Sequence, residues 1–220
     1  RRVLFRSGFS MQPEKLAETM EGPSVQWMRS MAIKHKIILT GSLIIEEAGQ
    51  YYNRLIWMLP NGSHGHYDKR HRFAFAGEDQ HYSHGNKRLI ASVNGWKINL
   101  QICYDLRFPV WARQQITDQP EYYVLIYVAN WPAVRSKIWS NLLLARAIEN
   151  QSYVIACNRL GEDGNGIPHK GGSAIINYLG EEIGFDKDDN IFQFNLYQEP
   201  QAQFRKEFPF LKEQDQFTIL

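Results

Sequence analysis

The sequence has little cysteine, little net charge and no long apolar run. Two cysteines, Cys103 and Cys157, are too few for a disulfide framework in 220 residues and favour a reducing, cytoplasmic setting. The 25 Lys and Arg are mixed with 23 Asp and Glu, so the basic stripe of a nucleic-acid-binding protein is lacking. No apolar run approaches the roughly 20 residues that span a bilayer, and the start of the chain does not resemble a secretory signal.

The composition is that of a folded protein. Hydrophobic residues make up 44% of the chain, aromatic residues 13% and charged residues 22%, which excludes disordered and collagen-like classes. A chain of this length buries a sizeable core without metals or disulfides. Because no linker or internal repeat divides the sequence, we predict a single domain over residues 1–220.

Strand-like and helix-like segments alternate along the chain. Residues 13–35 predict a helix interrupted at Gly22-Pro23, and residues 138–150 predict a second helix with apolar residues three and four apart. Asn94-Gly95 is a strong hairpin signal. Hairpins mixed with helix-separated strands predict an α+β fold with a mixed sheet. The predicted strands lie at residues 37–45, 51–59, 89–93, 97–102, 122–129, 153–157 and 173–177.

The sequence also predicts the structure of two segments near the C-terminal end. Residues 161–172 contain five glycines and predict a turn-rich loop near the rim of a site. The aromatic-rich tail, residues 204–217, is predicted to pack against the domain.

Cys103 stands where an apolar strand gives way to a polar turn and a helix. The positive end of a helix lowers the pKa of a neighbouring thiol, and backbone N–H groups at such a turn can hold an oxyanion. The alternative is a buried structural cysteine. Cys157 lies inside an apolar strand and is predicted to be a core residue.

A nucleophilic cysteine needs charged partners. His71 and Lys69 lie in the segment 67–71, and Glu78 follows a glycine turn. A Cys–His pair is the usual means of activation, whereas a lysine cation would stabilise both a thiolate and an oxyanion. Each of these charges alone is more often a solvated surface group, so the residue types leave the choice open.

Several segments in the same order resemble the nitrilase, or carbon–nitrogen hydrolase, superfamily. They are Tyr67-Asp-Lys-Arg-His71, Gly77-Glu78, Ile102-Cys-Tyr-Asp-Leu-Arg-Phe-Pro109, Val128-Ala-Asn-Trp-Pro132, Ala145-Arg-Ala-Ile-Glu-Asn150, Ala156-Cys-Asn-Arg-Leu-Gly161 and Gly171-Gly-Ser-Ala-Ile-Ile-Asn177. Gly8-Phe-Ser-Met11, Asn130-Trp-Pro132 and the tail 204–211 resemble the omega-amidase branch.

The resemblance implies an α–β–β–α sandwich that hydrolyses amides through a thioester without a cofactor. It implies that Cys103 is the nucleophile and that Lys69 and the backbone N–H of Tyr104 hold the oxyanion. Glu78 matches the accessory glutamate that orients the lysine. A Lys⁺ beside the thiol favours the thiolate, in agreement with these residue types.

Four residues are candidates for the substrate pocket. Trp131 and Phe9 are expected to form its walls, and Tyr67 to position polar groups. Arg107 could clamp a substrate carboxylate with its guanidinium fork. The superfamily resemblance places an arginine here whatever the substrate, which favours an ion pair with Asp105 or another acid instead.

The third member of the family's Glu-Lys-Cys triad is not matched. The segment 5–9 aligns with the family's Phe-x-x-Gly-Phe, which puts Val3 where the general-base glutamate belongs and leaves no first strand before it. We therefore expect residues 1–7 to be truncated or foreign to the family. Because general-base catalysis contributes roughly 10²–10⁴-fold, we expect this chain to be impaired.

The resulting functional prediction is an amidase for the omega-amide of 2-oxoglutaramate or 2-oxosuccinamate, working as a homodimer or higher homo-oligomer through the helix at 138–150. The small-molecule amide is its expected partner; nucleic acid and membrane are not. A catalytically dead binding subunit and an amidase for another amide or carbamoyl compound stay open as alternatives.

A metal site is a weaker alternative. Five of the seven histidines lie between residues 64 and 84, and His-x-His spacing can chelate zinc. No cysteine or acid cluster joins them and the family resemblance implies no metal, so we expect none. The five are His64, His66, His71, His81 and His84.

Overall fold

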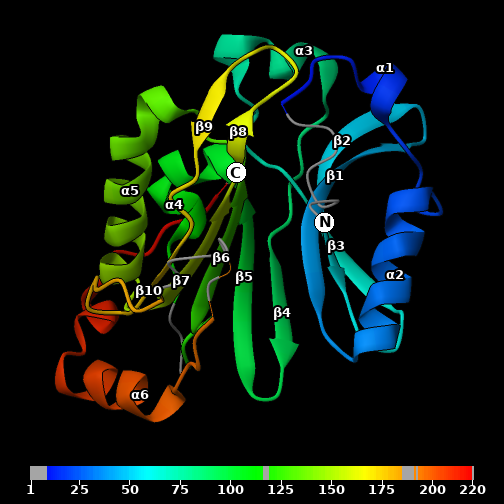
Figure 1. Cartoon of the computed structure of the whole chain (residues 1–220). Helices are drawn as coiled ribbons and strands as arrows, with labels where there is room; N and C mark the ends of the chain where they lie inside the picture. The colour runs from blue at the N-terminus through cyan, green and yellow to red at the C-terminus, as the bar shows by residue number, and fades with distance from the viewer. Residues whose placement is uncertain (1–8, 116–118, 185–190, 192, 220) are drawn as a thin grey trace.

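Two β-sheets pack face to face in a computed structural model, and a long helix covers the outer face of each (Figure 1). The structure describes residues 9–115, 119–184, 191 and 193–219. The order of layers is α–β–β–α, which confirms the predicted α+β sandwich. The predictions for residues 1–7, including the position of Val3, lie outside the described residues.

The first sheet is a three-stranded antiparallel meander ordered β1-β2-β3. Its strands are β1 (Leu39–Glu47), β2 (Gln50–Met58) and β3 (His64–Asp68). Helix α2 (Pro23–His35) lies on its outer face and buries Val25, Met28 and Ala32 there. Pro23 occupies the first turn of α2, where its missing N–H costs nothing. The helix predicted over 13–35 is therefore two helices, the other being α1 (Pro13–Leu16).

The second sheet has five strands ordered β10-β7-β6-β5-β4. β5, β6 and β7 run parallel, while β4 and β10 pair antiparallel at the edges. Asn94 and Gly95 join β4 to β5 with φ of 47° and 81°, as the hairpin signal predicted. The strands are β4 (Leu89–Val93), β5 (Trp96–Ile102), β6 (Val124–Ala129), β7 (Tyr153–Asn158) and β10 (Ala174–Ile176).

Two apolar layers flank this second sheet. Helix α5 (Ser136–Glu149) buries Trp139, Leu143 and Ala147 against its outer face. On its inner face, Leu100, Ile102, Ile126 and other side chains meet Leu55 and Trp57 of the first sheet. β6 is buried at every position, which explains why its sequence is apolar without alternation.

The connections that follow β3, β5, β6 and β7 meet at one edge of the sandwich. Ligands of parallel sheets bind at this carboxyl edge of the strands. The connections include η1 (Ala74–Ala76) and α3 (Glu78–His81) after β3, η2 (Cys103–Arg107) and α4 (Pro109–Ala112) after β5, η3 (Ala133–Arg135) after β6, and the hairpin of β8 (Leu160–Glu162) and β9 (Pro168–Lys170) after β7.

Two expectations do not match the structure, and the first is Cys157. Predicted to be a core residue, it is exposed on β7, because its side chain points away from the buried positions of that strand. The glycine-rich segment 161–172 is not wholly loop, because β8 and β9 pair within and beside it. The tail packs as predicted: α6 (Gln198–Glu207) and η4 (Phe210–Glu213) follow one another, and Leu211 is buried. Among the described residues no helix is long and apolar enough to cross a membrane. The single-domain organisation stays a prediction.

Arg54 is a buried cation within the first sheet, and we predict that it is important for stability. Its side chain is 1% exposed and contacts Asp68 at 2.6 Å and Glu47 at 2.9 Å. Burial opposes the charge, but the two carboxylates outweigh it and raise the pKa of Arg54. Arg54→Met leaves Asp68 without its partner, so we expect the free energy of unfolding to fall by about 3–5 kcal/mol in urea titrations.

Arg29→Met is the matched control. Arg29 lies 3.5 Å from a Glu21 side chain that is 71% exposed, and such surface pairs contribute less than about 1 kcal/mol. Equal losses in the two variants would contradict the role assigned to Arg54.

Candidate active site

Cys103 lies at the carboxyl end of β5 in a strained backbone conformation. Its φ is 43°, in the left-handed region that non-glycine residues rarely adopt. Such strain costs of order 1–3 kcal/mol and persists only where the surrounding structure enforces it. Here the buried strand before Cys103 and η2 after it fix the turn.

Lys69 and Glu78 form a buried ion pair. The Lys69 Nζ lies 2.6 Å from Glu78 Oε2 and 2.9 Å from Oε1, and both side chains are 2% exposed. Glu78 also accepts the backbone N–H of Phe73 at 2.5 Å. Burial opposes the charge of Lys69, but the Glu78 carboxylate outweighs it, so the pKa of Lys69 is raised and the side chain stays cationic.

The Cys103 thiol is protonated at neutral pH. Burial raises its pKa to about 11, against the opposing effect of Lys69 and of a hydrogen bond from the Asn130 backbone. Lys69 lowers the pKa of the thiol, in the direction expected, but the loss of hydration on burial outweighs this attraction. Attack by this sulfur requires a base that removes the proton.

Asp105 ties the turn after Cys103 to the first sheet. Its carboxylate accepts the Tyr67 hydroxyl at 2.7 Å, the Ile102 N–H at 3.0 Å and the His71 N–H at 3.0 Å. His71 also approaches it through Nδ1 at 2.8 Å and stacks on Phe108. In the structure, His71 therefore binds Asp105. The buried Tyr67 binds the same carboxylate and so supports the turn that follows Cys103.

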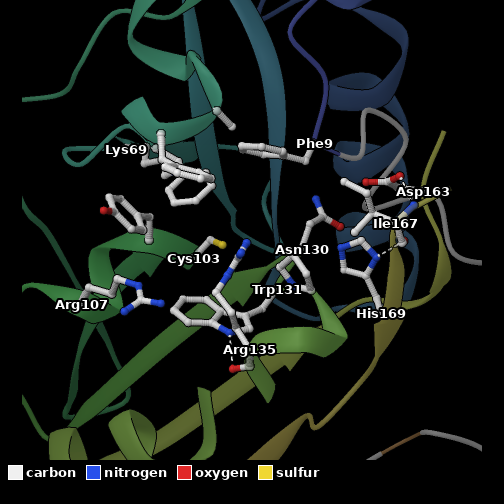
Figure 2. A pocket seen from close by; sticks show the side chains of 15 residues that line it. Phe9, Lys69, Cys103, Arg107, Asn130, Trp131, Arg135, Asp163, Ile167 and His169 are labelled. Carbon is white, nitrogen blue, oxygen red and sulfur yellow. Dashed lines mark hydrogen bonds between the residues drawn. The ribbon is translucent and has the colours of Figure 1, made fainter. Parts of the chain in front are cut away.

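A cavity of about 210 Å³ opens beside Cys103 (Figure 2). Its base holds Cys103 and Lys69. Of the four candidate pocket residues, Phe9, Trp131 and Arg107 line it and Tyr67 does not. The other residues lining it are Phe73, Phe75, Ala76, Tyr104, Asn130, Pro132, Arg135, Asp163, Ile167 and His169.

Two guanidinium groups reach this cavity. Arg107 stacks on the Trp131 ring at 5.2 Å and on the Tyr104 ring at 6.0 Å. The ion pair expected between Arg107 and Asp105 or another acid is not found among the described residues, where Asp105 instead binds Tyr67 and His71. The guanidinium of Arg135 lies over the Phe73 ring at 5.3 Å.

The β8–β9 hairpin and Asn130 form a wall of hydrogen-bond acceptors. Asp163 is 9% exposed and His169 is 4% exposed. One oxygen of Asp163 accepts the N–H groups of Asn165 and Ile167, and the other has no partner among the described residues. His169 Nδ1 lies 2.9 Å from the Ile167 carbonyl, and Nε2 is without a partner within the described chain, where it can accept a hydrogen bond in the neutral ring.

A second cavity, of about 30 Å³, lies on the other side of Lys69 and Cys103. Asn53 and Tyr82 line it, together with residues 9–11 and Glu78. Glu78 is the acid that reaches it within the described ranges. The volume suits a single water molecule beside the sulfur.

The histidine-rich segment does not assemble a metal site in the described part of the chain. No group of three or more His, Cys, Asp or Glu side chains there has a metal-binding arrangement. His64 and His66 lie on β3, and His71 is engaged by Asp105.

The comparison with known families agrees with this geometry. The carbon-nitrogen hydrolase family model matches residues 4–186. The chain belongs to the carbon–nitrogen hydrolase family. The recognition made from the motifs is therefore confirmed, and with it the assignment as a hydrolase.

Curated relatives lie in the omega-amidase branch of this family. The omega-amidase YafV of Yersinia enterocolitica is 39% identical over 219 residues, which cover 99% of this carbon–nitrogen hydrolase and 84% of that protein. The 2-oxoglutaramate amidase of Bacillus subtilis is 31% identical over 211 residues, covering 94% and 80% of the two chains.

Solved structures of the family have the same fold. A CN-hydrolase superfamily protein from Xanthomonas campestris, with an arsenic adduct in its active site, superimposes with a TM-score of 0.90 at 38% identity, covering 99% of this chain and 84% of that one. Saccharomyces cerevisiae Nit3, of the nitrilase superfamily, superimposes with a TM-score of 0.79 at 26% identity, covering 94% and 78%.

Sequence reasoning placed Cys103, Lys69 and Glu78 together, and the structure brings them to one site. It missed Phe73, Arg135, Asp163 and His169 as lining residues. Arg135 lies four residues after Trp131, at the end of η3, and this closeness to a predicted pocket residue was a usable signal. The glycine-rich segment was expected near the rim of a site, but nothing in it indicated that Asp163 and His169 would line the cavity.

The raised pKa of Cys103 predicts a steep pH dependence of alkylation. In a Cys157→Ser background, the rate of reaction with iodoacetamide should rise about tenfold per pH unit from pH 7 to pH 10, because only the thiolate reacts. Lys69→Met removes the cation that lowers the pKa and should slow the reaction at pH 8. Glu78→Gln removes an anion that raises it and should accelerate it. A rate that is flat between pH 6 and pH 9 would contradict the assignment.

Proposed function

We propose that this carbon–nitrogen hydrolase is a thiol-dependent omega-amidase. It hydrolyses the side-chain amide of short α-keto acid amides, 2-oxoglutaramate and 2-oxosuccinamate, to the acid and ammonia. The observation that carries the proposal is Cys103 in a strained turn beside the buried Lys69–Glu78 pair, at the base of a small cavity. Its similarity to proteins named omega-amidase and 2-oxoglutaramate amidase supports the choice of substrate.

In the proposed reaction, the Cys103 sulfur loses its proton to a base and attacks the amide carbon. The charge that develops on the carbonyl oxygen is held by the Lys69 ammonium and the backbone N–H of Tyr104. A donor aimed at such an oxyanion contributes roughly 3 kcal/mol. The amide nitrogen takes up a proton and leaves as ammonia, and water then cleaves the thioester to release the acid and the thiol.

The proposed reaction needs a general base that takes the proton of Cys103. A thiol with a pKa of about 11 is overwhelmingly protonated at pH 7. Glu78 already holds Lys69 and the Phe73 N–H, so it serves as a positioning residue. Val3, at the position that matches the family's base, has no acid group. We therefore propose that the 220-residue chain hydrolyses its substrate slowly.

We predict that a carboxylate at position 3 restores turnover. Val3→Glu, made in a chain extended by a family first strand, should raise ammonia release from 2-oxoglutaramate about 10²–10⁴-fold over the same extended chain with valine. Ammonia release is followed with a coupled assay. Adding Cys103→Ala should abolish it.

The same assay separates the alternatives. Faster release from an N-carbamoyl amine than from 2-oxoglutaramate or 2-oxosuccinamate would move the proposal to another substrate class. No release from any of the three by the extended Val3→Glu chain would favour a catalytically dead binding subunit. The retained Lys69–Glu78 pair argues against that outcome, because an inactive protein gains nothing from a buried ion pair beside a thiol.

We also propose a homodimer, formed through α5, in a reducing cytoplasmic setting. Ile138 and Ile148 of this helix are 40% and 48% exposed, so the helix presents apolar surface after covering its own sheet. Ile148→Glu should convert the dimer to a monomer in sedimentation experiments, because the interface would bury an unpaired charge. Phe75→Glu, which alters a residue 90% exposed on η1, is the control and should stay dimeric. A monomeric parent chain would refute the proposed assembly.

A further inference from the structure

The charges that line the cavity are not balanced within the described residues. Lys69 is neutralised by Glu78. Neither Arg107 nor Arg135 has a carboxylate within ion-pair distance in the described ranges, and Asp163 is the single acid among the lining residues. A half-buried guanidinium without an anion has lost hydration that no partner replaces. The cavity therefore favours an anionic ligand.

The two guanidinium groups differ in how they are held. Arg107 contacts the Tyr104 and Trp131 rings and is part of the wall that they form. Arg135 contacts the Phe73 ring, and its backbone carbonyl accepts the Trp131 indole N–H at 2.8 Å, which fixes the segment that carries it. In the view of Figure 2, Arg135 lies between Arg107 and the hairpin residues, below Cys103.

We propose that Arg135 holds the carboxylate of the substrate, so that the protein selects amides that carry an acid group over neutral amides. The guanidinium fork matches a carboxylate with two parallel hydrogen bonds, and its stacking on Phe73 keeps the fork oriented. The inference rests on the proposed amidase function for which end of the substrate meets Cys103.

The acceptor wall gives the substrate a direction. Asp163 offers a free carboxylate oxygen, and Asn130 Oδ1 and His169 Nε2 have no partner among the described residues. A substrate carboxylate placed against that wall would meet the like charge of Asp163 and the unpaired Asn130 Oδ1. It is therefore directed to Arg135 and away from the hairpin.

Binding can be measured without turnover in the Cys103→Ala chain. Glutaramate and pentanamide are the probes, since they differ in carrying a carboxylate or a methyl group at the far end. We expect Arg135→Gln to weaken the binding of glutaramate about 30-fold or more in calorimetry and to change that of pentanamide by less than about twofold. Arg135→Lys should retain part of the preference, because the charge stays and the fork is lost.

Arg29→Gln, on the remote helix α2, is the matched control and should change neither affinity. Thermal melting of the Arg135 variants checks that they fold, and Arg135→Lys keeps the test valid where Arg135→Gln does not. Three results would overturn the inference: no binding of glutaramate by the Cys103→Ala chain, equal weakening of both probes, or a preference that disappears in Arg107→Gln and survives in Arg135→Gln. Failure of the amidase proposal gives a different result, which is no ammonia release by the extended Val3→Glu chain while the binding preference persists.

Discussion

The buried ion pair between Lys69 and Glu78 is the constraint on which the site depends. Two charges with side chains 2% exposed are tolerated only because each satisfies the other at 2.6 Å. The pair fixes a cation beside Cys103 in a place where water would otherwise be needed to stabilise it. Burial raises the pKa of the Cys103 thiol, so the nucleophile depends on a base. The same exclusion of water strengthens the attraction between Lys69 and Glu78.

The site is assembled from both sheets, and Asp105 joins them. It follows β5 in the second sheet, yet it binds Tyr67 of β3 and His71 just beyond it. Asp105 thereby holds the lysine-bearing connection against the cysteine-bearing turn. The inter-sheet core of Leu55, Leu100 and Ile102 keeps the two layers in register beneath that contact. Packing and polar bonding act on the same few residues, which leaves the catalytic geometry little freedom.

Sequence reasoning reached the architecture and the reacting residues, but not the walls of the cavity. Apolar runs and the Asn94-Gly95 turn are strong local signals for strands and a hairpin, and the order of the motifs along the chain identified the family. Which side chain faces a cavity depends on how separate connections pack, and that is a property of tertiary contacts. An ion pair of Arg107 with Asp105 or another acid was expected from the superfamily resemblance, whereas Asp105 turns toward the other sheet. Asp163 and His169 line the cavity because β8 and β9 pair as a hairpin, and the glycine-rich sequence predicted a loop there instead.

The lining of the cavity is distributed over separate connections. The reacting groups follow β3 and β5, while Arg135 and Asn130 follow β6 and the hairpin residues Asp163 and His169 follow β7. A change in the hairpin or in η3 can thus alter which molecules fit without moving the cysteine or its lysine. The residues that select the substrate therefore lie on different connections from the residues that react with it. Proteins with this fold can change their substrates while they keep the same reaction.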